Sequence, residues 1–169
     1  MPISADEVVD VLDRLAAAGI HASVAGGWAV DALLGRVTRE HGDLDLALDA
    51  ATIPRAIEAL EALGLRIEVD ERPARLAMGD GRRMVDLHPV RWGADGTGRQ
   101  AGMHGDEFVY PAGSTDARGR IGDRQVRCLT PELLVTFHLG YEPRAVDRAD
   151  MTALAARYRL KLPAAYRDG

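Results

Sequence analysis

The spacing of apolar and polar positions along the chain predicts helices and strands that alternate through its first half. Between Ser4 and Gly19 an apolar residue recurs every third or fourth position, and Ser4 with Glu7 fits a capping box, so this segment is predicted to be an amphipathic helix. The elements predicted after it are a strand over residues 20–26, a helix over 28–34, a strand over 43–49 and a helix over 52–64 that Thr52 caps.

The second half predicts hairpin-like strands followed by helices. Residues 93–122 hold eight of the 18 glycines, so loops and short strands are expected there. Thr130-Pro131 has the cap and first-turn proline of a helix start, and a last helix is predicted from about Arg144 to Tyr158. Further strands are predicted over residues 65–70, 74–78, 82–90 and 124–129. This order favours an α/β or α+β domain with a mixed sheet.

Composition places the chain among ordinary globular proteins. Its 169 residues are 47% hydrophobic and 28% charged, and no apolar run is long enough to cross a membrane. The first residues lack the pattern of a secretory signal, and the single cysteine, Cys128, excludes an internal disulfide, so a cytoplasmic protein is expected. A net charge of −5 argues against extended nucleic-acid binding, although it leaves room for one nucleotide.

Two carboxylates interrupt the strand over residues 43–49. Asp43 and Asp45 lie two positions apart and therefore share one face of the strand, about 6.5–7 Å apart at the backbone. Carboxylate oxygens suit magnesium, and Asp86 in the strand over 82–90 could add a third to the same patch of sheet. Such a cluster repels itself unless a cation is present. The alternative is a solvated strand end, which explains most Asp-x-Asp pairs.

Gly26-Gly27 lies where a predicted strand meets a predicted helix. At such a junction the backbone N–H groups can approach a phosphate, helped by the helix N-terminus. Tight packing at a strand–helix corner is the better explanation of the glycine pair when it is considered alone. The pair fits neither a dinucleotide fingerprint nor a Walker loop. Its position before the Asp-x-Asp pair and a third strand aspartate is what favours a phosphate site.

This order of motifs resembles the polymerase-beta-like nucleotidyltransferase superfamily. Residues 25–48, AGGWAVDALLGRVTREHGDLDLAL, are more narrowly similar to aminoglycoside 2″-nucleotidyltransferases and small lincosamide nucleotidyltransferases, and residues 137–154 resemble the C-terminal helical segment of that group. The resemblance implies an α+β nucleotidyltransferase fold, with a mixed, twisted sheet flanked by helices. It also implies a catalytic domain over residues 1–129 and a C-terminal helical cap of the same compact unit over residues 130–169.

The resemblance assigns roles to the motif residues. Gly26 and Gly27 would contact the triphosphate of a nucleoside triphosphate, with ATP the expected co-substrate. Asp43 and Asp45 would hold magnesium, with two ions expected, and Asp86 would complete the metal site. Asp86 is also a candidate general base toward an acceptor hydroxyl that attacks the α-phosphorus and releases pyrophosphate.

Two further residues, Arg39 and His41, stand in the turn before the metal strand and could reach the phosphates, although a solvated turn is the alternative. His88 shares the strand face of Asp86 and could be catalytic or merely supporting. Arg144 and Arg148 could meet phosphates, or pair with Asp147 and its neighbours on their own helix.

Three classes of function stay open at this point. The first is nucleotidyl transfer to a small hydroxylated acceptor, such as a cationic antibiotic of the aminoglycoside class or a lincosamide. The second is the same chemistry on a protein or an RNA end, as in toxin-type relatives, which the acidic net charge disfavours for RNA. The third is a non-catalytic nucleotide-binding module, which three retained carboxylates disfavour. The expected assembly is a monomer or a homodimer.

Overall fold

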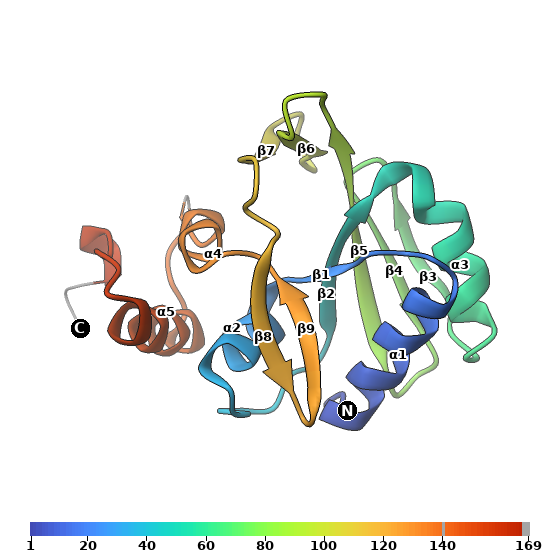
Figure 1. The fold of residues 1–169 in the computed structure, drawn as a ribbon, viewed down its shortest axis with the longest axis horizontal. Helices are drawn as coiled ribbons and strands as arrows, with labels where there is room; N and C mark the ends of the chain where they lie inside the picture. The colour runs from blue at the N-terminus through green and yellow to red at the C-terminus, as the bar shows by residue number, and fades with distance from the viewer. Residues whose placement is uncertain (140, 167–169) are drawn as a thin grey trace.

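The computed structural model describes residues 1–139 and 141–166, and it shows one twisted mixed sheet with helices packed against it (Figure 1). The helices are α1 (Ala5–Ala17), α2 (Gly26–Leu34), α3 (Ile53–Glu61), α4 (Pro131–Phe137) and α5 (Ala145–Tyr158), with 3-10 turns η1 (Ala50–Thr52) and η2 (Ala164–Tyr166). The strands are β1 (Ser23–Val24), β2 (Leu44–Asp49), β3 (Arg66–Glu71), β4 (Arg75–Gly79), β5 (Met84–Trp92), β6 (Gly98–Ala101), β7 (Glu107–Tyr110), β8 (Ala117–Ile121) and β9 (Arg124–Cys128). The predicted α+β class is confirmed.

The centre of the sheet is the parallel pair of β2 and β5. The strand order is β3-β4-β5-β2-β1-β9-β8, and β6 continues the sheet from the far end of β5 and pairs with β7. In the register of the parallel pair Asp45 stands opposite Asp86 and Ala47 stands opposite His88. The expectation that the strand of Asp86 lies beside the strand of Asp45 is therefore confirmed.

The helices form two groups. α1 and α3 lie against each other, whereas α2, α4 and α5 gather around the β8–β9 side (Figure 1). The predicted capping box starts α1, because the Ser4 hydroxyl accepts from the N–H of Glu7 and the Glu7 carboxylate accepts from the N–H of Ser4. Thr130 likewise caps α4 by accepting from the N–H of Leu133.

Three local predictions needed correction. The predicted strand over 20–26 shrinks to Ser23–Val24, and α2 begins at Gly26, so both glycines lie in the first turn of the helix. Ile20 is drawn into the end of α1, where its N–H donates to the carbonyl of Leu15. Thr52 does not cap α3 with its side chain. The Asp49 carboxylate instead accepts from the N–H of Ala51 and starts the η1 turn.

Packing of β2 in the core determines which face of the sheet carries Asp45. The apolar residues of β2, Leu44, Leu46 and Leu48, are at most 2% exposed. Each buried leucine is worth about 1.5–3 kcal/mol, so these side chains hold β2 in one orientation and turn Asp45 to the opposite face. In the part of the chain that the structure describes, no helix is both long and apolar enough to span a bilayer.

Candidate active site

The two aspartates that face each other across β2 and β5 form the centre of the site. The side chain of Asp45 is 27% exposed, and Asp86 is buried at 7% exposure. Asp43 stands one residue before β2 and is at the surface. Because alternate strand residues share a face, all three predicted carboxylates belong to the same side of the sheet.

The charges of these carboxylates oppose one another. Loss of hydration and the charge of Asp45 raise the pKa of Asp43 above its usual value. Burial and the charge of Asp45 also raise the pKa of Asp86, although the guanidinium of Arg75 opposes this shift. Arg75 Nη1 donates to Asp86 Oδ2 at 3.0 Å, and its Nε donates to Glu71 at 2.8 Å. Raised pKa values in a cluster of carboxylates mark a place where a cation would stabilise the ionised forms.

The donor set suits a hard cation. Asp43, Asp45 and Asp86 offer only carboxylate oxygens, the ligands that magnesium prefers. Within residues 1–139 and 141–166, no three carboxylate, histidine or cysteine side chains stand close enough to form a metal cluster as they are. Two of the three aspartates already have partners, since His88 bonds Asp45 and Arg75 bonds Asp86. An ion bound by the three aspartates would therefore compete with these two cationic or hydrogen-bonding partners.

The glycine pair is fitted closely against the site. Gly26 has a φ of +56°, and a Cβ at this position would lie 3.0 Å from Cγ of Asp45 and would overlap its Oδ2. A Cβ on Gly27 would lie 2.7 Å from Cε1 of His41 and would overlap the Arg39 guanidinium. The Ala25 side chain makes no capping bond, so the first N–H groups of α2 keep their capacity to bind an anion.

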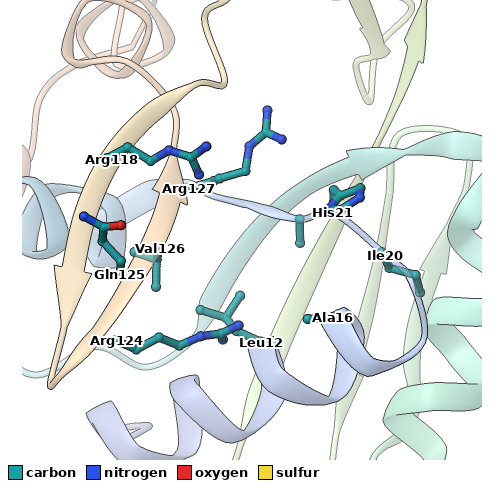
Figure 2. A pocket seen from close by; sticks show the side chains of 10 residues that line it. Leu12, Ala16, Ile20, His21, Arg118, Arg124, Gln125, Val126 and Arg127 are labelled. Carbon is teal, nitrogen blue, oxygen red and sulfur yellow. The ribbon is translucent and has the colours of Figure 1, made fainter.

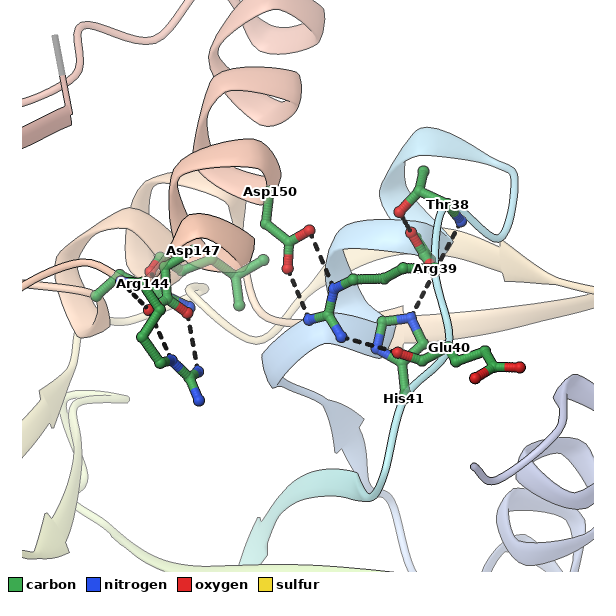
Figure 3. Close-up of polar contacts among 10 residues, drawn as sticks. Thr38, Arg39, Glu40, His41, Arg144, Asp147 and Asp150 are labelled. Atoms are coloured by element: carbon green, nitrogen blue, oxygen red, sulfur yellow. Dashed lines mark hydrogen bonds and ion pairs between the residues drawn. The ribbon is translucent and has the colours of Figure 1, made fainter. Parts of the chain in front are cut away.

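Arg39 and His41 lie against Gly27, and each is bonded to an aspartate. Figure 3 shows the contact of Arg39 with Asp150. Arg39 forms an ion pair with Asp150 of α5, with 2.8 Å between Nη2 and Oδ2. His41 is 3% exposed, and its Nε2 lies 2.6 Å from Oδ2 of Asp31. Burial alone would raise the pKa of Asp31, but hydrogen bonds from His41 and Thr38 hold it below its usual value. Arg39 is thus part-exposed near the predicted phosphate side, whereas His41 is a buried support.

The secondary candidates have local partners. Arg144 is the N-cap residue of α5, and its guanidinium donates to Asp147 at 2.9 and 3.0 Å (Figure 3). Arg148 donates to Glu142 and to the carbonyl of Ala165. The local pairing predicted as the alternative to phosphate binding is therefore found for Arg144, whereas both partners of Arg148 lie outside α5.

A chain of hydrogen bonds orients Asp45 from the side of β6. Gln100 Nε2 donates to the carbonyl of Ala74 and to Nδ1 of His88, each at 3.1 Å, and its Oε1 accepts from the Tyr110 hydroxyl at 2.6 Å. Because Nδ1 of His88 accepts, its Nε2 carries the proton and donates to Asp45 at 2.9 Å. His88 is therefore a positioning group for Asp45.

A separate cavity of about 190 Å³ lies between α1 and the β8–β9 hairpin (Figure 2), and none of the three site aspartates lines it. Its wall includes three arginines and His21, and none of its lining residues is a carboxylate. Arg124 and Arg127 are already paired with Asp13 and Asp116. This cavity therefore lacks the ligands that the proposed chemistry requires.

Comparisons with known proteins identify the family of the chain. A sequence model of the family described as aminoglycoside-2″-adenylyltransferase matches residues 7–154. The chain is also 33% identical over 130 residues to a lincosamide resistance protein of Staphylococcus haemolyticus, a match that covers 76% of this chain and 80% of that protein. The chain belongs to the aminoglycoside-2″-adenylyltransferase family. It is a nucleotidyltransferase of the antibiotic-modifying kind, as the sequence resemblance predicted.

A second relative and a solved structure are also similar to this nucleotidyltransferase. It is 32% identical over 120 residues to a 2″-aminoglycoside nucleotidyltransferase of Escherichia coli, and the match covers 70% of this chain but only 63% of that relative. The lincosamide antibiotic adenylyltransferase LnuA, solved with lincomycin bound, superimposes with a TM-score of 0.81 at 29% identity, over 93% of this chain and 99% of LnuA. The predicted nucleotidyltransferase fold is confirmed.

Four supporting residues of this nucleotidyltransferase were not predicted from its sequence. Arg75 lies two residues before Ala77 on β4 and so shares its face, and Ala77 stands opposite Asp86 on β5. A predicted register for the β4–β5 hairpin would therefore have placed Arg75 near Asp86. Gln100 and Tyr110 lie in the glycine-rich segment, where the pattern predicts no register. Asp150 pairs with Arg39 across 111 residues, and no local pattern signals such a contact.

Proposed function

We propose that this nucleotidyltransferase is magnesium-dependent, and that it transfers the nucleoside monophosphate of ATP to a hydroxyl of a small antibiotic, an aminoglycoside or a lincosamide, with release of pyrophosphate. The observation that carries the proposal is the register that sets Asp45 opposite Asp86, with Gly26 packed directly against Asp45. A phosphate-binding helix start and a pair of carboxylates thus meet at one point.

In this proposal the glycines and Arg39 bind the triphosphate, and the aspartates bind the metal. Gly26 and Gly27 present the N–H groups at the start of α2 to the triphosphate, and Arg39 supplies positive charge behind them. His41 supports this side from its buried pair with Asp31. Asp43, Asp45 and Asp86 would hold the magnesium ions, which polarise the phosphate and acidify the acceptor hydroxyl when bound.

Asp86 is assigned the role of accepting the proton of the attacking hydroxyl. The acceptor oxygen forms a bond to the α-phosphorus, the bond between the α-phosphorus and the bridging oxygen breaks, and pyrophosphate leaves. Arg75 occupies Oδ2 of Asp86, so Oδ1 takes the proton of the attacking hydroxyl. With the acceptor hydroxyl acidified by magnesium bound beside Asp86, a carboxylate of ordinary basicity could accept its proton.

The test is a mass-shift assay. The protein is incubated with magnesium and ATP, together with lincomycin or tobramycin, and the products are analysed by mass spectrometry and by pyrophosphate release. We expect an acceptor heavier by one adenylate, and no product with Asp45→Asn. Label that appears on protein or RNA alone, with no small-molecule product, would replace the small acceptor with a macromolecule. Unchanged activity in Asp45→Asn would overturn the proposed site.

A further inference from the structure

A pocket of about 250 Å³ opens directly beside Asp45 and Gly26. It lies on the His88 side of Asp45, between the β6–β7 hairpin and α4. Three aromatic side chains form much of its wall, Phe108 and Tyr110 of β7 and Phe137 of α4. Their rings pack edge to face, with Tyr110 and Phe137 centroids 4.9 Å apart. The wall is therefore rigid and largely apolar.

The pocket offers very little negative charge. Asp45 is the one carboxylate among its lining residues as the structure describes them, and neither arginine nor lysine lines it. Most of the polar groups in the wall are already engaged, because Tyr110 donates to Gln100 and His88 bonds both Gln100 and Asp45. The neighbouring Asp86 is paired with Arg75 and does not line the pocket.

The position of the cations indicates which substrate enters this pocket. Arg39 lies against Gly27 in the first turn of α2, where its guanidinium would overlap a Cβ on that glycine, and Arg144 begins α5. Neither lines the pocket. A triphosphate is drawn to the arginines and the start of α2, and pyrophosphate leaves on that side. In-line displacement then requires the acceptor to attack from the opposite side, which is the pocket.

We infer that this pocket binds the acceptor, and that it selects a hydroxylated molecule with an apolar body and at most one positive charge over a polycationic aminosugar. The inference rests on the proposed function and names the acceptor class for the same site. An apolar body is stabilised by the aromatic wall through burial of surface. Each additional ammonium group would lose its hydration without finding a carboxylate, which disfavours its binding there.

The experiment compares two acceptors and two matched variants of β7. Lincomycin carries one basic amine on an apolar arm, whereas tobramycin carries several ammonium groups. We expect kcat/KM with ATP and magnesium to be at least about tenfold higher for lincomycin, the discrimination that about 1.4 kcal/mol gives. Phe108→Ala should raise the KM for lincomycin about tenfold and leave the KM for ATP unchanged. The neighbouring Val109→Ala, similarly exposed at 43% against 37%, should change neither KM.

The outcomes separate this inference from the proposed function. A higher kcat/KM for tobramycin would overturn the inference while the nucleotidyl transfer stands. A Phe108→Ala variant that raises the KM for ATP in place of that for lincomycin would assign the pocket to the nucleoside and would also overturn it. Phe108→Glu gives an independent check on folded protein, because a new carboxylate should lower lincomycin turnover and raise relative activity on tobramycin. Absence of adenylate transfer to any acceptor would instead contradict the proposed function.

Discussion

Gly26→Ala is the substitution whose effect follows most directly from the structure. Gly26 has a φ of +56°, in the left-handed region, and an alanine there costs about 1–2 kcal/mol of folding free energy. For a chain of this length that corresponds to a fall in Tm of roughly 2–8 °C. The added Cβ also overlaps Oδ2 of Asp45 and comes within 3.0 Å of its Cγ. Stability and activity should therefore both fall, for separate reasons.

The loss of activity should exceed what the loss of stability explains. To relieve the overlap the Asp45 carboxylate or the start of α2 must shift by about 1 Å, and a shift of that size in a reacting centre costs on the order of 100-fold in rate. We expect kcat/KM for pyrophosphate release to fall about 100-fold at a temperature where Gly26→Ala is still folded. Circular dichroism and thermal unfolding establish that temperature.

Gly35→Ala is the matched control for backbone strain. Gly35 ends the same helix with a φ of +72°, and a Cβ there would meet nothing within 4 Å. The Gly35→Ala variant should lose about as much folding stability as Gly26→Ala, yet keep kcat/KM within about twofold of the wild type. Equal activity losses in the two variants would refute the reasoning, because strain alone would then account for both. Near-normal activity of Gly26→Ala would refute the close contact with Asp45.

Three further predictions concern the carboxylates and their supports. Asp43→Asn should abolish transfer. Without magnesium it should also raise the Tm at neutral pH, because the raised pKa of Asp43 means that its ionised form destabilises the fold. Thermal unfolding should show this gain in Tm shrinking as the pH falls toward 4. Asp31 has a lowered pKa, so its ionised pair with His41 stabilises the fold above about pH 4, and this contribution is lost as the pH falls further. In Asp31→Asn the Tm should therefore depend less on pH in the acid range. Gln100→Leu should lower kcat about tenfold with little change in the KM for ATP, whereas Tyr110→Phe, which keeps the Gln100 contact to His88, should lower it only a few-fold.

The local pattern of β2 was enough to predict the centre of the site. Alternating leucines and aspartates fix one face of that strand in the core, and the same alternation in β5 fixes the face of Asp86. The register that brings Asp45 opposite Asp86 follows from burial of both apolar faces. A helix predicted over residues 28–34 also came within two residues of its observed start at Gly26.

The support around that centre could not be predicted in the same way. The contact of Arg39 with Asp150 and that of His88 with Gln100 join segments with no shared periodicity. Such pairs form only after the sheet and α5 have packed, so the sequence carries no short-range signal for them. The glycine-rich residues 93–122 add to the difficulty, because glycine permits many backbone conformations and weakens any predicted strand boundary.

The contacts between α2 and α5 have a consequence for engineering chimeras. Arg39 reaches Asp150 across the helix group, and the Tyr158 hydroxyl donates to the carbonyl of Leu33 at 2.9 Å. A C-terminal segment exchanged from another enzyme would have to bring its own carboxylate and hydroxyl to these two points. The C-terminal segment is thus joined by specific contacts to the part of the chain that is proposed to bind the nucleotide. New specificities should therefore arise more readily by point substitution in the pocket wall than by recombination of whole segments.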